Sequence, residues 1–195
     1  MEAEKPAVVR AAAGQALTRR EFVGASAAGL LALRQPRQVT IGVQSYSFRD
    51  RSLEDAIAAM QKIGLRHCEL WQGHVEPKGQ QRPERRAWRE SVPMDVFHQI
   101  RDQFAKAKIT LVAYNISIQD DFSDAELERS FDMATAVGAP LITSSSNIKT
   151  VARIAPVAEK RKMLVGMHNH SRIDPNEFAT AASLSAALQQ ANTSP

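Results

Sequence analysis

Cysteine is almost absent from this chain of 195 residues, which contains a single one, Cys68. One cysteine excludes an internal disulfide and the Cys-x-x-Cys motifs of zinc and redox sites. No apolar run reaches the ~18 residues that a transmembrane helix needs, so the sequence predicts no stable membrane span. With 44% hydrophobic and 24% charged residues, the composition is that of a globular protein rather than a disordered or collagen-like one.

A strong excess of positive charge is also missing from most of the chain. The formal net charge is +4, and residues 1–38 contribute +3 of it, because six Lys or Arg residues face three Glu residues there. Proteins that bind DNA or RNA usually carry a basic patch or stripe. The nearly neutral remainder of the chain therefore predicts no nucleic-acid partner.

Residues 18–33 read Thr-Arg-Arg-Glu-Phe-Val and continue as a short stretch rich in Ala, Gly and Leu. This pattern resembles a twin-arginine export signal. It predicts that residues 1–38 are a signal or leader, disordered or helical, and that the protein is periplasmic or secreted. An amphipathic N-terminal helix with a chance arginine pair is the alternative. No Ala-x-Ala site precedes Arg34, so the leader is cut elsewhere or kept as an anchor.

After the leader, the sequence alternates between strand-like and helix-like segments. Five β-then-α units follow one another at a spacing of about 31 residues, which predicts a parallel sheet with right-handed crossovers. The expected strands are Val39–Phe48, His67–Trp71, Ile109–Ile118, Pro140–Ser144 and Met163–His168.

Each expected strand is followed by a segment that predicts a helix. Apolar residues recur at helical spacing in these segments, and several open on an N-cap signal. Pro156 predicts a break or kink in the fourth helix, and the polar stretch 72–91 predicts no element. The expected helices are 52–64, 93–107, 123–137, 147–160 and 174–190.

Two architectures have this alternation, an open doubly wound sheet and a (β/α)₈ TIM barrel. The dinucleotide-binding form of the first needs Gly-x-Gly-x-x-Gly after the first strand, whereas residues 45–50 contain no glycine. The sequence therefore predicts an α/β fold of the TIM-barrel type. A complete barrel needs roughly 250 residues, so residues 39–195 are expected to form a truncated barrel of its first five β/α units. The open strand edges predict association into a homo-oligomer.

Polar side chains gather where each expected strand ends, which is where TIM barrels place their active sites. His168 and His170 are two residues apart, so they point to the same side, about 6–7 Å from each other and within reach of one divalent ion. His168 is the expected metal ligand; the alternative is one histidine at the barrel mouth and one solvated in a loop. The expected contacts to a substrate are Gln44, Tyr46, Glu69, Trp71, His74, Asn115 and His170.

Several of these polar groups have two interpretations. Glu69 lies between Cys68 and Leu70, which are expected to pack on the helices, so its carboxylate points toward the barrel axis and needs a partner or a metal. A structural ion pair is the alternative. His74 either faces a ligand or is a solvated loop residue. A basic cluster after the second strand either holds a phosphate or carboxylate or is an exposed loop, and it consists of Lys78, Arg82, Arg85, Arg86 and Arg89.

Three segments resemble the sugar phosphate isomerase/epimerase superfamily, the xylose isomerase-like barrels. They are Ile41–Phe48, Gly64–Trp71 and Val165–His170, and the resemblance covers residues 39–190. It implies a divalent metal ion (Mn, Mg, Co or Zn) that binds a hydroxy-ketone or hydroxy-aldehyde and stabilises an enediolate after proton abstraction next to the carbonyl.

The resemblance also implies roles for single residues. His168 matches the family's ligand on the fifth strand, His170 a neighbouring ligand or substrate contact, and Glu69 a substrate-side carboxylate. The family's other ligands, and usually one of its acid–base glutamates, lie on strands six to eight. No catalytic residue is therefore assigned, and the chain is expected to be inactive alone.

The expected function is thus that of a metal-dependent sugar or sugar phosphate isomerase/epimerase. A lyase or dehydratase acting on an oxidised sugar uses the same enolising step and remains an alternative. A non-catalytic sugar-binding module is another alternative. The nearly neutral body and the export signal argue against an endonuclease IV-like nuclease.

Overall fold

The structure of the protein is a computed structural model that describes residues 39–193. The chain divides into two units between Val39 and Thr40, and the fold given below is that of the second. The export signal expected in residues 1–38 lies outside the described residues. None of the helices between residues 39 and 193 has the length and apolar character that crossing a bilayer requires.

Five parallel strands form one sheet in the order of the chain, with β1 and β5 at its edges. In doubly wound sheets the spatial order of the strands reverses at a switch point. The sequential order found here therefore confirms the barrel-type topology. The strands are β1 (Val43–Gln44), β2 (His67–Trp71), β3 (Thr110–Asn115), β4 (Leu141–Ser144) and β5 (Leu164–Met167).

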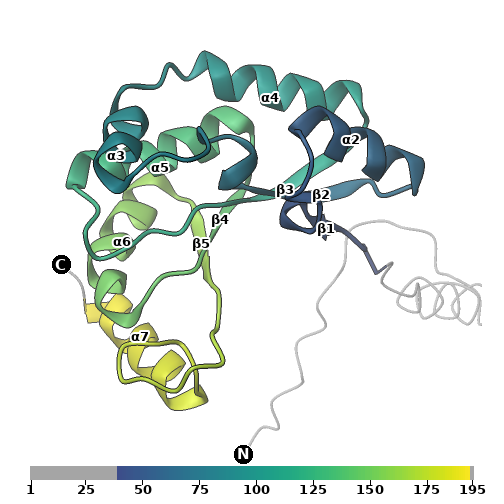
Figure 1. Cartoon of the computed structure of the whole chain (residues 1–195). Coiled ribbons are helices and arrows are strands. Elements are labelled where there is room, and N and C mark those ends of the chain that lie inside the picture. The colour runs from purple at the N-terminus through teal and green to yellow at the C-terminus, as the bar shows by residue number, and fades with distance from the viewer. Residues whose placement is uncertain (1–38, 194–195) are drawn as a thin grey trace, which may run out of the picture. The chain divides into compact units, whose positions relative to one another are not determined.

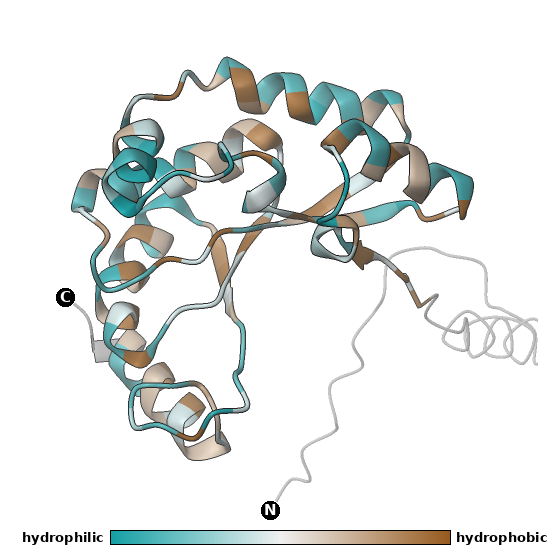
Figure 2. Ribbon diagram, in the orientation of Figure 1, coloured by the Kyte–Doolittle hydropathy of each residue, from teal (hydrophilic) through white to brown (hydrophobic). Residues whose placement is uncertain are grey.

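The helices follow the strands in the expected alternation and lie along one side of the sheet (Figure 1). Apolar residues recur at intervals along α2 and α4, with hydrophilic residues between them (Figure 2). The helices are α2 (Leu53–Lys62), α3 (Arg82–Ser91), α4 (Asp95–Lys106), α5 (Asp124–Val137), α6 (Ile148–Arg161) and α7 (Ala181–Thr193), with 3₁₀ turns η1 (Ser45–Phe48) and η2 (Gln72–His74).

Side chains cap three of the helices, and the sequence predicts the first two of these caps. The hydroxyl of Ser52 accepts a hydrogen bond from the Asp55 amide, and that of Ser123 accepts one from the Glu126 amide. The side chain of Asn147 does the same for α6. Each cap satisfies one of the amides that a first helical turn leaves without a partner.

The expectation for the first strand was wrong in extent. Of the predicted Val39–Phe48, only Val43–Gln44 is a strand, and Ser45–Phe48 forms η1. The Ser45 hydroxyl accepts a hydrogen bond from the Trp71 amide at 2.9 Å. The Ser45 side chain thus replaces the backbone carbonyl that a longer β1 would offer to β2. After Gln44 the backbone turns away from β2.

Three helix predictions also need correction. The stretch 72–91 is not devoid of structure, because it contains η2 and α3. Of the break or kink expected at Pro156, the break does not occur, since α6 is continuous through it. The last helix begins at Ala181 rather than near residue 174.

The late start of α7 has a local cause. The Asp174 carboxylate accepts a hydrogen bond from the Asn176 amide, which closes a turn, and the Glu177 carboxylate binds His170 instead of capping a helix. The cap is supplied later by Thr180 and Ser183, whose hydroxyls accept from each other's amides.

The core lies between the sheet and the helices. Alternate residues of β2, Cys68 and Leu70, are fully buried on the helix side. They pack in one cluster with Phe97 and Phe104 of α4 and Phe131 of α5. The opposite face of β2 is thereby left to His67, Glu69 and Trp71, all of them partly exposed.

The buried position of Cys68 predicts an unreactive thiol. Burial, together with the negative charge of Glu69, raises the pKa of Cys68 to about 12. Because the thiolate is the reactive form, we expect labelling by a disulfide reagent at pH 8 to be about 100-fold slower in the folded protein than in denaturant. Equal labelling rates would contradict the packing of β2 against the helices.

Candidate functional site

A chain of hydrogen bonds joins the carboxyl ends of four strands around Glu69. The Gln44 amide donates to Glu69 Oε1 at 2.9 Å, and the Thr143 hydroxyl donates to the same oxygen. Asn115 Nδ2 donates in turn to Thr143 Oγ1 at 3.1 Å. The structure therefore brings together three predicted site residues, on β1, β2 and β3, and adds Thr143 on β4, which the sequence reading did not single out.

The carboxylate of Glu69 is held by neutral donors. Both hydrogen bonds use Oε1, and among residues 39–193 neither a donor to Oε2 nor a cation within ion-pair distance is found. Oε2 is also absent from the buried polar atoms without a partner, so it remains open to solvent. The ion pair considered for Glu69 is thus not formed within the described residues, and one carboxylate oxygen is free to accept from a ligand.

A small residue permits this arrangement. Ala113 of β3 is the register partner of Glu69, and β3 lies between β2 and β4 in the sheet. Residues paired across parallel strands point to the same face, so a larger side chain here would stand between Glu69 and Thr143.

Aromatic rings follow directly after Glu69 on the same face. The Trp71 ring meets the Tyr46 ring edge-to-face, with centroids 4.9 Å apart. A Cβ on Gly73 would lie only 2.2–2.5 Å from three atoms of the indole. Glycine at this position therefore makes the space that the Trp71 ring fills.

His74 connects the turn η2 to the turn η1 through both of its ring nitrogens. Its Nε2 donates to the Phe48 carbonyl at 3.2 Å, so Nδ1 accepts from the Ser45 hydroxyl at 2.9 Å. Burial lowers the pKa of His74, which keeps the ring neutral in this network. Both ring nitrogens serve the connection between η1 and η2, and a contact between His74 and a substrate stays a prediction.

The two histidines after β5 lie close to each other. The rings of His168 and His170 have centroids 5.5 Å apart. His168 Nδ1 is 3.3 Å from the Ser145 hydroxyl, and His170 Nδ1 bonds the Glu177 carboxylate. The His168 amide continues the ladder to β4, and Gly166, two residues earlier, pairs with Thr143. His168 thus follows β5 on the face that carries Glu69.

These histidines do not form a metal site by themselves. Within the part of the chain that the structure describes, no three His, Cys, Asp or Glu residues are arranged to hold a metal ion. Two imidazoles are fewer than the donor sets of zinc or manganese centres. The metal role of His168 therefore stays a prediction that requires further ligands.

Most of the predicted basic cluster is engaged inside the protein. Arg82 Nη1 and Nη2 both donate to the buried Glu126 carboxylate at 2.7 Å, and Arg89 donates to it at 3.1 Å. Arg86 also bonds it at 3.4 Å. Burial alone would raise the pKa of Glu126, but the hydrogen bonds from Arg82 and Arg89 outweigh it and lower the pKa. These three arginines fasten α3 to α5 and are not free for a ligand.

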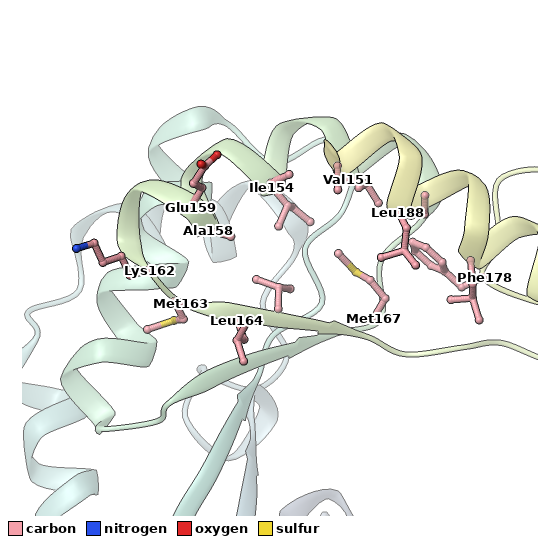
Figure 3. A pocket seen from close by; sticks show the side chains of 15 residues that line it. Val151, Ile154, Ala158, Glu159, Lys162, Met163, Leu164, Met167, Phe178 and Leu188 are labelled. Carbon is pink, nitrogen blue, oxygen red and sulfur yellow. The ribbon is translucent and has the colours of Figure 1, made fainter. Parts of the chain in front are cut away.

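A cavity of about 730 Å³ lies away from these polar groups, between α6, β5 and α7 (Figure 3). Its walls are apolar apart from Glu159 and Lys162. It lacks the convergent polar groups that a sugar would need, and the exposed Leu164 and Leu188 form part of its wall. This apolar cavity belongs to the last β/α unit, at the open edge of the sheet. Association of this edge with a second copy of the chain, and hence the homo-oligomer, stays a prediction.

Comparisons with known proteins show likeness in structure but not in sequence. No family model matches the chain, and no curated protein matches its sequence. Three crystal structures are similar: an uncharacterized protein from Parabacteroides distasonis (TM-score 0.58, 21% identity), a candidate xylose isomerase from Rhodospirillum rubrum (0.55, 15%) and the candidate 3-DHS dehydratase AsbF from Bacillus anthracis, involved in petrobactin synthesis (0.54, 17%).

The similarity extends over 77%, 80% and 79% of this chain, but over only 58%, 62% and 60% of the respective structures. The chain therefore spans about three fifths of their length. The parallel sheet, its sequential strand order and these neighbours agree. The chain has the fold of the xylose isomerase-like TIM barrels, in the form of five consecutive β/α units.

Proposed function

We propose that the carboxyl ends of β1–β5 form the substrate-binding side of a sugar or sugar phosphate isomerase or epimerase. The observation that carries this proposal is the Glu69 carboxylate, which neutral neighbours hold through Oε1 while Oε2 remains open. A free carboxylate oxygen beside an aromatic ring suits a polyhydroxylated ligand, because it accepts from hydroxyl groups while the ring packs on the sugar face.

In this proposal Glu69 Oε2 accepts a hydrogen bond from a substrate hydroxyl and orients the carbon chain. Gln44 and Thr143 fix the carboxylate, and Trp71 excludes water from one side of the substrate. The enolising reaction moves a carbon-bound proton to a base and returns it, so the sugar is neither oxidised nor reduced. A divalent metal would require ligands beyond His168 and His170, and the base is not assigned.

A dehydratase is the second candidate, favoured by the likeness to the candidate 3-DHS dehydratase. It would share the enolising step and then break a C–O bond, so that the hydroxyl group takes up the abstracted proton and leaves as water. A non-catalytic sugar-binding module would use the same contacts without moving a proton.

The Glu69→Gln variant tests the proposed binding site. Glutamine preserves the shape but removes the charge, so we expect the Kd for a ketose such as fructose to rise about tenfold, as when a hydrogen bond to a charged group is lost. Calorimetry with the full chain measures it, and Glu159→Gln, an exposed carboxylate on α6, is the matched control.

Ketose binding that is absent, or that Glu69→Gln leaves unchanged, would contradict the site. Exchange of the carbon-bound proton with D₂O, followed by NMR with added Mn²⁺, separates the two kinds of function. Exchange above the rate without protein supports an enolising enzyme and contradicts the binding module.

A further inference from the structure

A second cavity, of about 500 Å³, lies beside the Glu69 site, between η1 and the segment that follows η2. Arg49, Lys78 and Arg85 contribute three cationic groups to its walls, and Tyr46 and Trp71 contribute aromatic surface. The three cations come from separate segments of the chain, and the fold brings them to one opening.

These cations differ from the arginines that fasten α3. Arg49 donates to the Tyr46 carbonyl at 3.4 Å and lies over the Tyr46 ring. Arg85 donates to the Gln80 carbonyl at 3.0 Å. Among the described residues, Lys78 has neither a hydrogen bond nor an ion pair. Backbone carbonyls leave the formal charge of these groups uncompensated.

The one carboxylate in the cavity wall is already neutralised. Glu76 is 8% exposed and accepts two hydrogen bonds from Arg89, at 2.7 and 2.9 Å. Arg85 also forms an ion pair with Glu76, but a looser one, with 3.9 Å between Nε and Oε2. The cavity wall therefore carries a net positive charge, because three cationic side chains face a single carboxylate that Arg89 also binds.

The position of Arg85 is fixed by its own helix. Arg82 and Arg89, on either side of it in α3, both bind the buried Glu126 of α5. Side chains of a rigid helix hold a ligand with less loss of entropy than those of a loop.

Trp71 links the cavity to the Glu69 site. This residue lines the cavity and lies two residues after Glu69 on the same face of β2. Residues at this spacing are about 6–7 Å apart along a strand. A ligand of sugar size can thus place its hydroxyl groups at Glu69 while its other end reaches past the Trp71 indole into the cavity.

We propose that this cavity binds the phosphate or carboxylate group of the substrate, so that the substrate is an anionic sugar. The inference rests on the proposed function for the identity of the whole ligand, but the anion contact can be tested by itself. Guanidinium groups bind phosphate and carboxylate oxygens in pairs, and a lysine adds a point charge.

The test titrates the full chain with inorganic phosphate and with acetate, with NMR of the Trp71 indole as the readout. We expect Lys78→Ala and Arg85→Ala each to raise the Kd of the preferred anion about tenfold. Lys106→Ala removes the same charge at the opposite end of the sheet, where α4 leads into β3, and should leave the Kd unchanged. Thermal melting of each variant checks that it is folded.

Comparison of fructose, fructose 6-phosphate and glucuronate then distinguishes the sources of the anion. Tighter binding of the phosphate ester indicates a sugar phosphate, and tighter binding of glucuronate indicates an oxidised sugar. Failure of both anions to bind, or equal effects of all three variants, would overturn the proposal. Fructose binding that responds to Glu69→Gln would then still stand, so the two proposals fail separately.

Discussion

The Gly73→Ala variant is expected to displace the Trp71 indole and to lower the free energy of unfolding by about 1–3 kcal/mol, the usual cost of overpacking. The added Cβ would lie 2.2–2.5 Å from three ring atoms, far inside van der Waals contact. The ring must rotate away, which breaks its edge-to-face contact with Tyr46 and opens the wall that the two proposed subsites share.

Fluorescence and urea unfolding measure this effect. A Trp88→Phe background leaves Trp71 as the only tryptophan, and its emission should shift to the red as the ring becomes solvated. Gly166→Ala is the matched control, because a Cβ there meets its nearest atom at 3.8 Å, an ordinary contact. Equal emission and equal stability of the two alanine variants would show that Gly73 is not required for the ring's position.

The Glu126→Gln variant is expected to lower the free energy of unfolding by about 3 kcal/mol, because it removes the carboxylate at the centre of a buried ion-pair network. Glu126 is fully buried and joins Arg82 and Arg89 of α3 to α5. We expect α3 to loosen first, which hydrogen exchange of its amides would detect, and the melting temperature to fall.

The control for this effect is Glu128→Gln, two residues further along α5. Glu128 is one-third exposed and pairs with Lys160 and Arg161, and such surface pairs contribute about 0–1 kcal/mol. Similar losses in the two variants would indicate that the buried network has no special role.

The same network predicts a loss of stability in acid. The pKa of Glu126 is lower in the folded protein than its ordinary value. Its contribution is therefore present above the unfolded-state pKa and is lost as the pH falls through the folded-state pKa. Urea unfolding between pH 5 and pH 2 should bring the wild type and Glu126→Gln closer together as the pH decreases.

Local signals in the sequence predicted much of the fold. The bounds of β2 agree with the prediction, and Ser52, Ser123 and Asn147 open helices as expected. A signal for α3 was present but unused, because Pro83 suits a first helical turn and the Glu84 carboxylate accepts from the Gln81 amide.

What the sequence could not predict depends on contacts between distant residues. Arg82 and Glu126 are 44 positions apart, and nothing local separates the arginines that bind Glu126 from Arg85, which faces the cavity. The capping pattern at residues 174–177 was misleading for the same reason, since the Glu177 carboxylate binds His170 instead.

The sequence predicted the face of the sheet to which the site residues point, but not which of them form hydrogen bonds with each other. Alternation along β2 correctly placed Glu69 opposite the buried Cys68 and Leu70. Its hydrogen bond to Thr143 spans 74 positions and crosses β3, the strand that lies between β2 and β4. No spacing rule reveals such a pair before the strand register is known.

The hydrogen-bonded series from Gln44 through Glu69 and Thr143 to Asn115 also bears on the thermodynamics of association. These side chains lose their conformational entropy during folding, so a ligand that binds does not have to immobilise them. Recognition at this edge should therefore be opposed mainly by the ligand's own loss of motion, and flexible sugars should be disfavoured relative to rigid rings of the same composition.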